Sequence, residues 1–573
     1  MNKMSKSLLL GILLFCGKLQ AQEYPQNYFS SPLDTPLVLV ATFGEIRPDH
    51  FHSGLDLGTQ EMEGVPVMSS ADGYISRIKV SPDGFGKALY ITHPNGYVTV
   101  YGHLQKFTQA VNELVRKTQY EEQKFAVEIQ PKSKDFRVKK GEVIAYSGST
   151  GSAEGPHLHF EIRDAETEEP INPLLFGIPI HDNVPPEIKY VRFFPTPEAG
   201  IVNKTDTAET FEVQVVDGVN ILNTPDFVQA FGMVSIGFAS VDHQEYSSAT
   251  LGIYSAELYI DGNLIYQWRM DRFSFDETRF VNAHIDYLSY RRDNVPIERC
   301  FRLPGNQLHI YGDSTQIGYQ NWTEDAPHDI KIVAKDFSGN SSVLEFQVIS
   351  YSSMFDRPYQ PRTPGGILVT NAKGIAIHKN DLDVVIPSGA VYDDFYFSDS
   401  QRKSNNYLSQ VYTVGDPYVA LQVPVTIGIK PNISIADSLK SKTVIVSILN
   451  DGTFSALPSS WNGQFLTGKT KNFGEFAILP DTTPPVLIKE YVPADLNSSR
   501  GSVIQIKVAD DLSGIKSYNG TLDGKWFLYE YNSKNHLLQA DLSAIETNKE
   551  HTSRIIVTDN CGNITTWEYK FWF

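Results

Sequence analysis

Two residues near the start of the chain have metal-binding side chains, and their spacing places them together. In the segment His52-Ser-Gly-Leu-Asp56, an extended backbone directs residues i, i+2 and i+4 to one side. His52 and Asp56 then share a face, and Gly54 between them leaves room for an ion. Imidazole and carboxylate are both zinc ligands. Such a pair also occurs as an ordinary surface hydrogen bond, so the two residues alone leave both interpretations open.

A second pair of histidines stands in the segment Gly155-Pro-His157-Leu-His159-Phe-Glu-Ile-Arg163. The period-2 geometry of a strand places both imidazoles on one face, while the apolar residues between and after them supply packing. The two rings would converge there. An isolated His-x-His pattern is equally typical of two half-exposed strand histidines.

A third element is Tyr101-Gly-His103-Leu, which closes the strand predicted for Tyr97-Val-Thr-Val-Tyr101. A lone histidine in a strand is usually structural. Along the chain, His52-Ser-Gly-Leu-Asp56 comes first and Tyr101-Gly-His103-Leu second. Val138-Lys-Lys-Gly-Glu-Val-Ile-Ala145 follows and leads into the segment with His157 and His159. In this order they resemble the lysostaphin and LytM-like zinc endopeptidases, peptidase family M23. The resemblance covers about residues 43–173, roughly a quarter of the chain.

The resemblance assigns a role to each of the five residues. His52, Asp56 and His159 match the three zinc ligands of the family, and His157 and His103 match its two non-ligand histidines. Three protein ligands with an open fourth position are typical of catalytic rather than structural zinc. Water bound in that position has a pKa lowered to about 7. His157 and His103 would position and deprotonate this water, and one of them would return a proton to the leaving amine.

Other features near these motifs fit less well. Some family members carry a tyrosine shortly before the first zinc histidine, and residues 42–51 contain none. Arg47 could supply positive charge instead, so the oxyanion donor stays open. His50 precedes His52 by two positions, but the Gly and Asp spacing favours His52. His93 stands beside a turn and is expected to close a hairpin. We leave His50 and His93 outside the site.

Composition predicts a mainly β, multi-domain protein. At 573 residues the chain exceeds what one hydrophobic core organises, and Thr, Val and Tyr favour strands. We expect an antiparallel β catalytic domain over 23–178, because short apolar runs alternate with turn residues there. Residues 107–124 interrupt this pattern with helical spacing. This insertion could form one wall of the cleft.

One pattern appears twice beyond residue 178. Val184-Pro-Pro-Glu-Ile188 opens a segment that ends in Ala334-Lys-Asp-Phe-Ser-Gly-Asn340, and Thr483-Pro-Pro-Val486 opens one that ends in Thr558-Asp-Asn-Cys-Gly-Asn563. We predict two copies of an Ig-like β-sandwich, over 179–351 and 481–573, and a third sandwich of uncertain type over 352–480. Their residues show no cluster of metal ligands or nucleophiles in the sequence, and a spacer role is expected.

The first residues predict export. Lys3 and Lys6 precede an apolar run over 8–15, and cleavage is expected near Ala21 or Gln22, so that residues 1–22 form a signal peptide. Phe15 before Cys16 disfavours lipid attachment. No later stretch approaches the length of a membrane span. The mature protein is therefore expected in the periplasm, in the medium or at the cell surface.

Charge and cysteine content exclude two classes of protein. The formal net charge is −18, which argues against a nucleic-acid partner. Cys300 and Cys561 are the cysteines left after cleavage, so the chain is no disulfide scaffold. A disulfide between these two is possible but unsupported.

The leading hypothesis is an exported metalloendopeptidase that uses Zn²⁺ to hydrolyse the peptide cross-links of peptidoglycan. The substrate comes from the resemblance alone. The alternatives are a catalytically silent scaffold or activator of a separate wall hydrolase, an adaptor barrel built around the 138–145 hairpin, and an adhesin with a minor hydrolase. A cell-surface or regulatory protein partner could bind through the C-terminal sandwiches. The sequence specifies neither the bond that is cut nor the oligomeric state.

Overall fold

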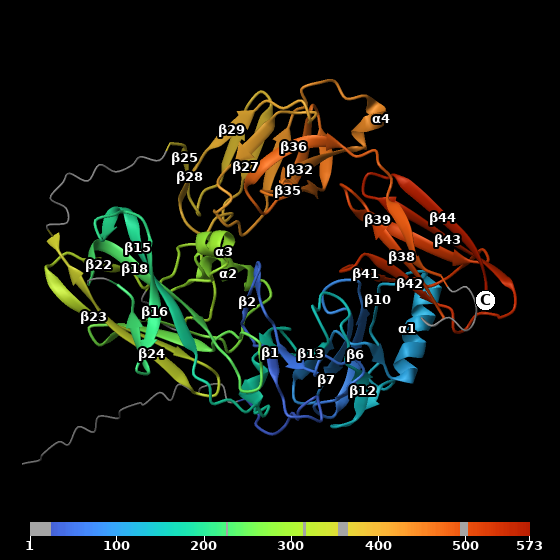
Figure 1. Ribbon diagram of the computed structural model, residues 1–573, viewed down its shortest axis with the longest axis horizontal. Helices are drawn as coiled ribbons and strands as arrows, with labels where there is room; N and C mark the ends of the chain where they lie inside the picture. The colour runs from blue at the N-terminus through green and yellow to red at the C-terminus, as the bar shows by residue number, and fades with distance from the viewer. Residues whose placement is uncertain (1–23, 225–226, 313–316, 353–364, 493–501) are drawn as a thin grey trace, which may run out of the picture.

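The computed structural model describes residues 24–224, 227–312, 317–352, 365–492 and 502–573. The predicted signal peptide and its cleavage position lie outside these ranges. Strands predominate, as the composition predicts, and form four successive domains (Figure 1). Within the described ranges no helix has the length and apolarity needed to cross a bilayer. Cys300 and Cys561 are both buried and unpaired.

The N-terminal domain is built on a nine-stranded sheet with a three-stranded sheet beside it. The strands are antiparallel, as expected. In sheet order the main path is β1 (Leu39–Ala41), β4 (Leu55–Gly58), β13 (His157–Asp164), β8 (Tyr97–Gly102), β7 (Lys87–Thr92), β6 (Gly73–Val80) and β10 (Val127–Ile129), with β11 (Arg137–Val138) and β14 (Pro170–Ile171) at its sides. The small sheet holds β5 (Pro66–Met68), β12 (Val143–Tyr146) and β9 (Lys106–Phe107); β2 (Ile46–Arg47) pairs with β3 (His50–Phe51), and a 3₁₀ turn, η1 (Pro173–Phe176), ends the domain.

The predicted helical insertion is present as α1 (Gln109–Glu122). Val111, Val115 and Gln119 recur every four residues and are the buried face of the helix. The helix ends where Gln123 adopts a left-handed conformation. On the opposite side, the ring of Tyr120 meets Trp526 of the C-terminal domain edge to face at 4.9 Å.

The second domain differs from the two-sheet sandwich expected over 179–351. Its strands form one ten-stranded sheet, and β24 pairs with both β17 and β18, so the sheet closes on itself. Helical turns that the sequence pattern did not predict lie between β20 and β21. The elements are β15 (Glu187–Val202), β16 (Glu209–Val216), β17 (Val219–Leu222), β18 (Val228–Val241), β19 (Ser255–Ile260), β20 (Asn263–Arg269), η2 (Thr278–Phe280), α2 (Val281–His284), α3 (Tyr287–Asp293), β21 (Glu298–Arg299), β22 (Gln320–Trp322), β23 (Ala326–Lys335) and β24 (Ser341–Ser350).

The third domain is a sandwich of two five-stranded sheets. One sheet runs β26 (Ile375–His378), β27 (Leu382–Ile386), β31 (Val425–Ile429), β35 (Phe465–Thr470), β34 (Ser459–Asn462), and the other runs β29 (Asp399–Arg402), β30 (Val411–Val414), β36 (Gly474–Pro480), β32 (Thr443–Ile448), β33 (Phe454–Leu457). A separate pair, β25 (Ile367–Val369) with β28 (Phe395–Phe397), and the short helix α4 (Asp437–Lys440) complete it.

The C-terminal domain is a sandwich of two four-stranded sheets. They are β37 (Val486–Tyr491), β38 (Val503–Ala509), β42 (Leu537–Asp541), β41 (Glu530–Asn532), and β40 (Lys525–Trp526), β39 (Ile515–Leu522), β43 (Glu550–Asp559), β44 (Ile564–Trp572). Its order of strand pairings repeats that of the second domain. β15–β18, β19–β20, β19–β23 and β23–β24 have counterparts in β37–β38, β39–β40, β39–β43 and β43–β44. The Ig-like character of both segments stays a prediction.

The N-terminal and second domains share one continuous hydrophobic core. Phe43 and Phe51 of the first domain both pack on Phe273 of the second, with ring centroids 5.0 and 5.6 Å apart. Gly44 lies so close to Met270 that an added Cβ would come within 2.6 Å of its side chain. The second domain is therefore packed behind the N-terminal one rather than tethered to it.

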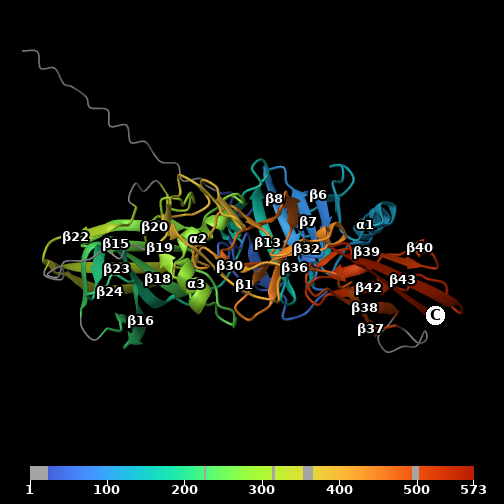
Figure 2. The same cartoon turned by 90° about the horizontal axis from the view of Figure 1, so that it is seen from above.

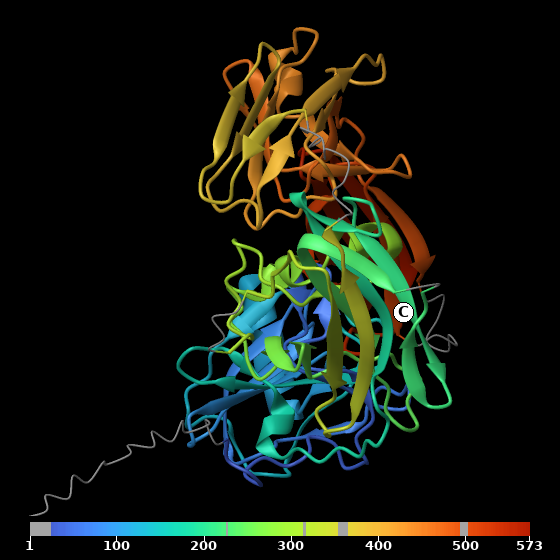
Figure 3. The same cartoon turned by 90° about the vertical axis from the view of Figure 1, so that its left-hand side faces the viewer.

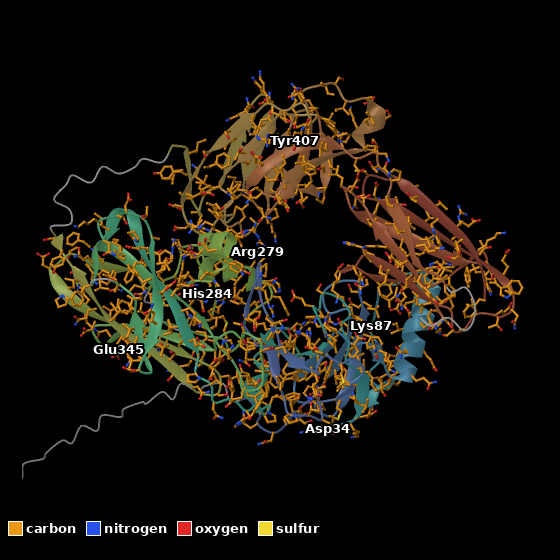
Figure 4. All side chains as sticks on the ribbon, viewed as in Figure 1. Asp34, Lys87, Arg279, His284, Glu345 and Tyr407 are labelled. Carbon is orange, nitrogen blue, oxygen red and sulfur yellow. The ribbon has the colours of Figure 1, made fainter. Side chains whose placement is uncertain are left out.

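The four domains form a ring, because the last one returns to the first (Figure 1). Arg279, labelled in Figure 4, pairs with Asp49 of the first domain at 2.9 Å and donates to Leu421 O of the third at 2.8 Å. Lys87, also labelled there, pairs with Glu530 of the C-terminal domain at 3.0 Å. From above, the second and C-terminal domains lie at opposite ends (Figure 2), and from the side the third domain stands over the others (Figure 3).

Candidate metal centre

Three neighbouring strands of the N-terminal sheet bring the candidate site residues together. His159 on β13 is directly opposite Asp56 on β4 and Gly102 on β8. His103 follows Gly102, and His157 lies two residues before His159 on the same face. Residues opposite one another across a sheet have adjacent side chains. All five predicted residues therefore meet at one place, although they come from three separate segments of the sequence.

The three residues matched to metal ligands present their ligand atoms to a single point. His52 Nε2 lies 3.1 Å from both Asp56 Oδ1 and His159 Nδ1, and Asp56 Oδ1 lies 2.9 Å from His159 Nδ1. Ligands at about 2.0–2.1 Å from a tetrahedral zinc ion stand roughly 3.3 Å apart. The spacing, the two nitrogens and the one carboxylate thus fit zinc.

His52 reaches this point by a route that the strand pattern did not predict. β3 ends at Phe51 and β4 begins at Leu55, so His52 lies in the connection between two strands rather than within one. The chain turns there because Gly54 lies directly against β13. A Cβ at Gly54 would be 2.4 Å from Phe160 O. The expectation of one extended strand was wrong, while the shared face of His52 and Asp56 holds.

Hydrogen bonds fix the ring orientation of both ligand histidines. His52 Nδ1 donates to Thr42 O at 2.8 Å, and His159 Nε2 donates to Glu161 Oε1 at 2.9 Å. Each bond leaves the other nitrogen free to bind metal. Glu161 is itself held by the Ser53 hydroxyl and by Arg163 Nε at 2.5 Å. Such partners orient metal ligands and raise their basicity.

Burial and charge set the protonation of these groups in opposite directions. Burial opposes charge on His159, but bonds to Asp56 and Glu161 outweigh it and raise its pKa to about 9. Burial also disfavours the Glu161 carboxylate, yet Arg163 and His159 lower its pKa to about 2. Burial, reinforced by His159 and His157, lowers the pKa of His103 to about 3. His103 is therefore neutral at physiological pH.

The two remaining histidines face the metal position with one nitrogen each. His157 Nδ1 donates to Gly155 O at 2.9 Å, and His103 Nδ1 donates to Thr150 O at 2.8 Å. His157 Nε2 is buried without a hydrogen-bond partner and lies 3.5 Å from Asp56 Oδ1. A buried polar atom without a partner is costly. Its position beside the ligand atoms fits a water or substrate group held at a metal.

Comparisons with known proteins match this region. The model of the family described as Peptidase family M23 matches residues 50–120 and 124–173, which contain all five histidine and aspartate residues. The N-terminal domain belongs to peptidase family M23. A second model, described as Zu5-like domain, matches residues 368–481, the third domain.

Curated relatives are similar to part of this chain. The DD-carboxypeptidase/endopeptidase Mpg of Neisseria meningitidis is 36% identical over 128 residues, which are 22% of this chain and 23% of Mpg. The peptidoglycan DD-endopeptidase ShyA of Vibrio cholerae is 32% identical over 134 residues, 23% of this chain and 25% of ShyA. This chain thus spans about a quarter of the length of the curated relatives it matches.

Two solved structures are similar in fold to part of this chain. One is the catalytic domain of the M23 protein EnpA of Enterococcus faecalis, at 23% identity and TM-score 0.20, covering 26% of this chain and 98% of that one. Another is the catalytic domain of lysostaphin from Staphylococcus simulans, at 24% identity and TM-score 0.18, covering 24% and 87%.

A cavity of about 630 Å³ opens over the five residues of the M23 domain. Arg47 and His50 line it, although Arg47 is paired with Glu45 at 2.9 Å and His50 bonds to Pro48 O. No part of the described segment 107–124 lines it, so the insertion does not form a wall of this cavity. His93 lies elsewhere, buried and bonded to Asp72 O and Thr99.

Sequence reasoning missed three contributors to the site. Glu161 follows His159 by two residues on β13, so the period-2 pattern already held this signal. Phe85 stacks on the His159 ring with centroids 4.6 Å apart, and Thr42 orients His52 through its carbonyl. Phe85 and Thr42 come from a loop and from the end of β1, and no motif in the sequence marks them.

Proposed function

We propose that this chain is an exported zinc metalloendopeptidase that hydrolyses peptide cross-links of bacterial peptidoglycan. The observation that carries the proposal is the convergence of His52 Nε2, Asp56 Oδ1 and His159 Nδ1 within 3.1 Å of one another, under an open cavity. A bound Zn²⁺ would polarise the scissile carbonyl and lower the pKa of its water to about 7.

His157 and His103 position the attacking water in this proposal, and His157 transfers its proton. Each ring is held by a backbone carbonyl at Nδ1, so that Nε2 is the unprotonated nitrogen. With Nε2 buried and unpaired, His157 is placed to accept a proton from the attacking water. His103, kept neutral by its lowered pKa, can bind the same water, and His157 can return the proton that it has accepted to the leaving amine. Positioned acid–base groups of this kind contribute about 10²–10⁴-fold to the rate.

The substrate class is supported by what the relatives act on. Mpg is named a DD-carboxypeptidase/endopeptidase and ShyA a peptidoglycan DD-endopeptidase. We extend this to a D-alanyl-type cross-link in a cell-wall peptide, with export supported by the predicted leader. The C-terminal sandwiches would act as spacers or bind a cell-surface partner. An intact ligand set argues against the scaffold alternative.

Release of soluble fragments from purified peptidoglycan tests the proposal. Zinc-loaded mature protein, starting near Glu23, is compared with His157→Ala, which removes a proton acceptor but no metal ligand. We expect release by the wild type, loss of release in a chelator, and a loss of about 10²–10⁴-fold in the variant. The variant should keep its zinc. A folded, zinc-loaded wild type that releases nothing from several wall types would contradict the proposal and favour the scaffold.

A further inference from the structure

Three aspartates of the second domain converge at its junction with the M23 domain. Asp182 lies in the segment before β15, Asp242 directly follows β18, and Asp336 follows β23. One carboxylate oxygen from each lies within 4.8 Å of the others. Asp242 and Asp336 are buried and Asp182 is half-buried. No lysine, arginine or histidine pairs with any of the three in the part of the chain that the structure describes.

The Asp242 carboxylate leaves one oxygen unsatisfied inside this cluster. The residue is 3% exposed, and its Oδ1 is buried without a hydrogen-bond partner. A cavity of about 20 Å³ is lined by all three aspartates, enough for one water-sized sphere. A water molecule would donate at most two hydrogens and would leave the charge uncompensated. Burying an uncompensated carboxylate is costly, so the cluster calls for a cation.

The same arrangement recurs in the C-terminal domain. Asp481 lies in the segment before β37, Asp510 directly follows β38, and Asp559 ends β43, and their oxygens again lie within 4.8 Å. Asp510 follows the counterpart of β18, and its Oδ1 is also buried without a partner. The same oxygen is thus left unsatisfied at equivalent places in two domains of different sequence.

One asparagine frames each cluster with matching hydrogen bonds. Asn340 Nδ2 donates to Asp182 O at 3.2 Å and to Asp336 Oδ2 at 2.7 Å. In the C-terminal domain, Asn563 Nδ2 donates to Asp481 O at 3.0 Å and to Asp559 Oδ2 at 2.7 Å. The asparagine belongs to the Asp-x-x-Gly-Asn turn. In each domain the asparagine of this turn therefore links two aspartates of the cluster. One opens the turn (Asp336 or Asp559), and the other precedes the paired prolines (Asp182 or Asp481).

We propose that each of these clusters, Asp182/Asp242/Asp336 and Asp481/Asp510/Asp559, binds one divalent cation of the calcium type. The ligands are all oxygens, which favours a hard cation over zinc. Two oxygens on opposite sides of a calcium ion, each at about 2.4 Å, are about 4.8 Å apart, and the oxygens of both clusters lie within that distance of one another. Water and backbone carbonyls would complete the six to eight ligands that calcium takes.

The first cluster is connected to the zinc-type centre through a short chain of contacts. Asp242 exchanges both backbone hydrogen bonds with Leu251, at 2.9 and 2.8 Å. The next residue, Gly252, bonds through its N–H to Thr42 Oγ1 at 3.1 Å and accepts from it at 3.2 Å. Thr42 O in turn orients His52. A cation at the first cluster would fix the backbone that supports the first metal ligand of the M23 domain.

The second cluster has a lysine beside it, whereas no lysine or arginine pairs with the first one among the described residues. Lys442 Nζ, from the third domain, donates to Asn563 Oδ1 at 2.6 Å, and Asp481 N donates to Lys442 O at 2.6 Å. A positive charge this close to the carboxylates competes with a bound cation. The first cluster is therefore expected to bind calcium more tightly than the second.

Calcium stoichiometry of the intact chain tests the inference. Mature zinc-loaded protein is freed of calcium on a chelating resin, its zinc is restored, and equilibrium dialysis then counts bound ⁴⁵Ca²⁺. We expect two ions for each chain. Asp242→Asn and Asp510→Asn, which keep the side-chain shape and remove the charge, should each leave one. Asp451→Asn, at an exposed turn of the third domain, should still bind two.

Binding of no calcium by the wild type at millimolar concentration would overturn the inference, whatever the variants do. So would two ions bound equally well by both cluster variants. Circular dichroism of each variant reports whether it folds. The wild-type count decides the question even if a variant does not fold. Because zinc stays bound and no substrate is used, neither outcome depends on peptidase activity.

Discussion

The zinc-type centre of the M23 domain and the Asp182/Asp242/Asp336 cluster behind it differ in the atoms they offer a metal. The first has two imidazole nitrogens and one carboxylate, with ligand atoms 2.9–3.1 Å apart. The second has carboxylates alone, with one oxygen of each within 4.8 Å of the others. Imidazole nitrogens at about 3 Å spacing suit a small tetrahedral ion, whereas a set of carboxylate oxygens alone suits a hard cation such as calcium. The ligand types therefore favour zinc at the first place and calcium at the second.

The two places also differ in how the fold assembles them. Asp56 on β4 and His159 on β13 are direct neighbours in one sheet, and the second nitrogens of His52 and His159 are fixed by Thr42 and Glu161. The aspartates come from three segment ends that meet at a domain junction. The ligands of the first site lie within one domain, while the cavity at the second is also lined by Leu39, Thr42 and Phe43 of the M23 domain. Its cation is therefore expected to stabilise the junction, and the zinc ion to serve chemistry.

Removal of a zinc ligand should produce the largest effect and separate the two places. His159→Ala removes one of three protein ligands, so zinc should be lost from the purified protein. The metal supplies several kcal/mol of transition-state stabilisation, and fragment release from peptidoglycan should fall by at least about 10³-fold. Metal analysis and the ⁴⁵Ca²⁺ count measure both sites in one sample. Calcium should remain at two ions for each chain.

A fall in the calcium count of His159→Ala would contradict the comparison. It would mean either that the aspartates do not form an independent site or that zinc loss unfolds the M23 domain. Circular dichroism separates these two causes. Asp451→Asn serves as the control for both metals.

The bond from His159 to Glu161 offers a smaller and more specific test. Glu161→Gln keeps the size of the side chain but removes the charge that orients His159 Nε2. Loss of such a partner costs about 10–100-fold in metal affinity. Zinc affinity measured by competition with a chromophoric chelator should fall by this amount. Exposed Glu166→Gln should leave it unchanged. An unaltered affinity in Glu161→Gln would show that the ring needs no orienting carboxylate.

Acid should separate the metals because their ligands release protons at different pH. Without metal, His159 keeps a proton below about pH 9, and zinc binding to Nδ1 must displace it. Zinc affinity should therefore fall about tenfold with each pH unit below 9. Burial, with Asp336 and Asp182 nearby, raises the pKa of Asp242 to about 7. Calcium affinity should stay nearly flat above pH 7 and fall below it.

Titrations of both metals between pH 6 and pH 8.5 check this difference. The result that would count against it is a zinc affinity independent of pH across that range. A calcium affinity that already falls between pH 8.5 and pH 7.5 would assign its binding to other groups than Asp242.

The contrast also explains which parts could be predicted from the sequence. His52, Asp56, His103, His157 and His159 stand in short ordered motifs, so their grouping was predictable. The position of His52 between two strands was not, because it depends on contact between Gly54 and β13. The closure of the second sheet through β24 depends on pairing between strands far apart in sequence. Local patterns do not encode such pairing.

The aspartate clusters were missed for the same physical reason. The sequence shows the Asp-x-x-Gly-Asn turn and the paired prolines as a repeated pattern at the ends of two segments. Asp242 and Asp510, however, stand in no shared motif. Only the pairing of β15 with β18, and of β37 with β38, brings them beside the turn. Helix α1 was predicted correctly because its period is local. Its contact with Trp526 was not, because the partner lies 406 positions further along.

The smallest expected effect tests whether the two places communicate. Asp242→Asn should weaken zinc binding at saturating calcium by a few fold, because Thr42 and Gly252 connect the first cluster to His52. Asp510→Asn should leave zinc affinity unchanged, since no such chain of contacts leads from the C-terminal cluster to a zinc ligand within the described residues. Effects of this size, about 1 kcal/mol, are typical of residues that act through a neighbour. Equal zinc affinities in the two variants would mean that the junction holds His52 without its cation. Equal losses would mean that calcium acts on the whole ring of domains rather than through Thr42.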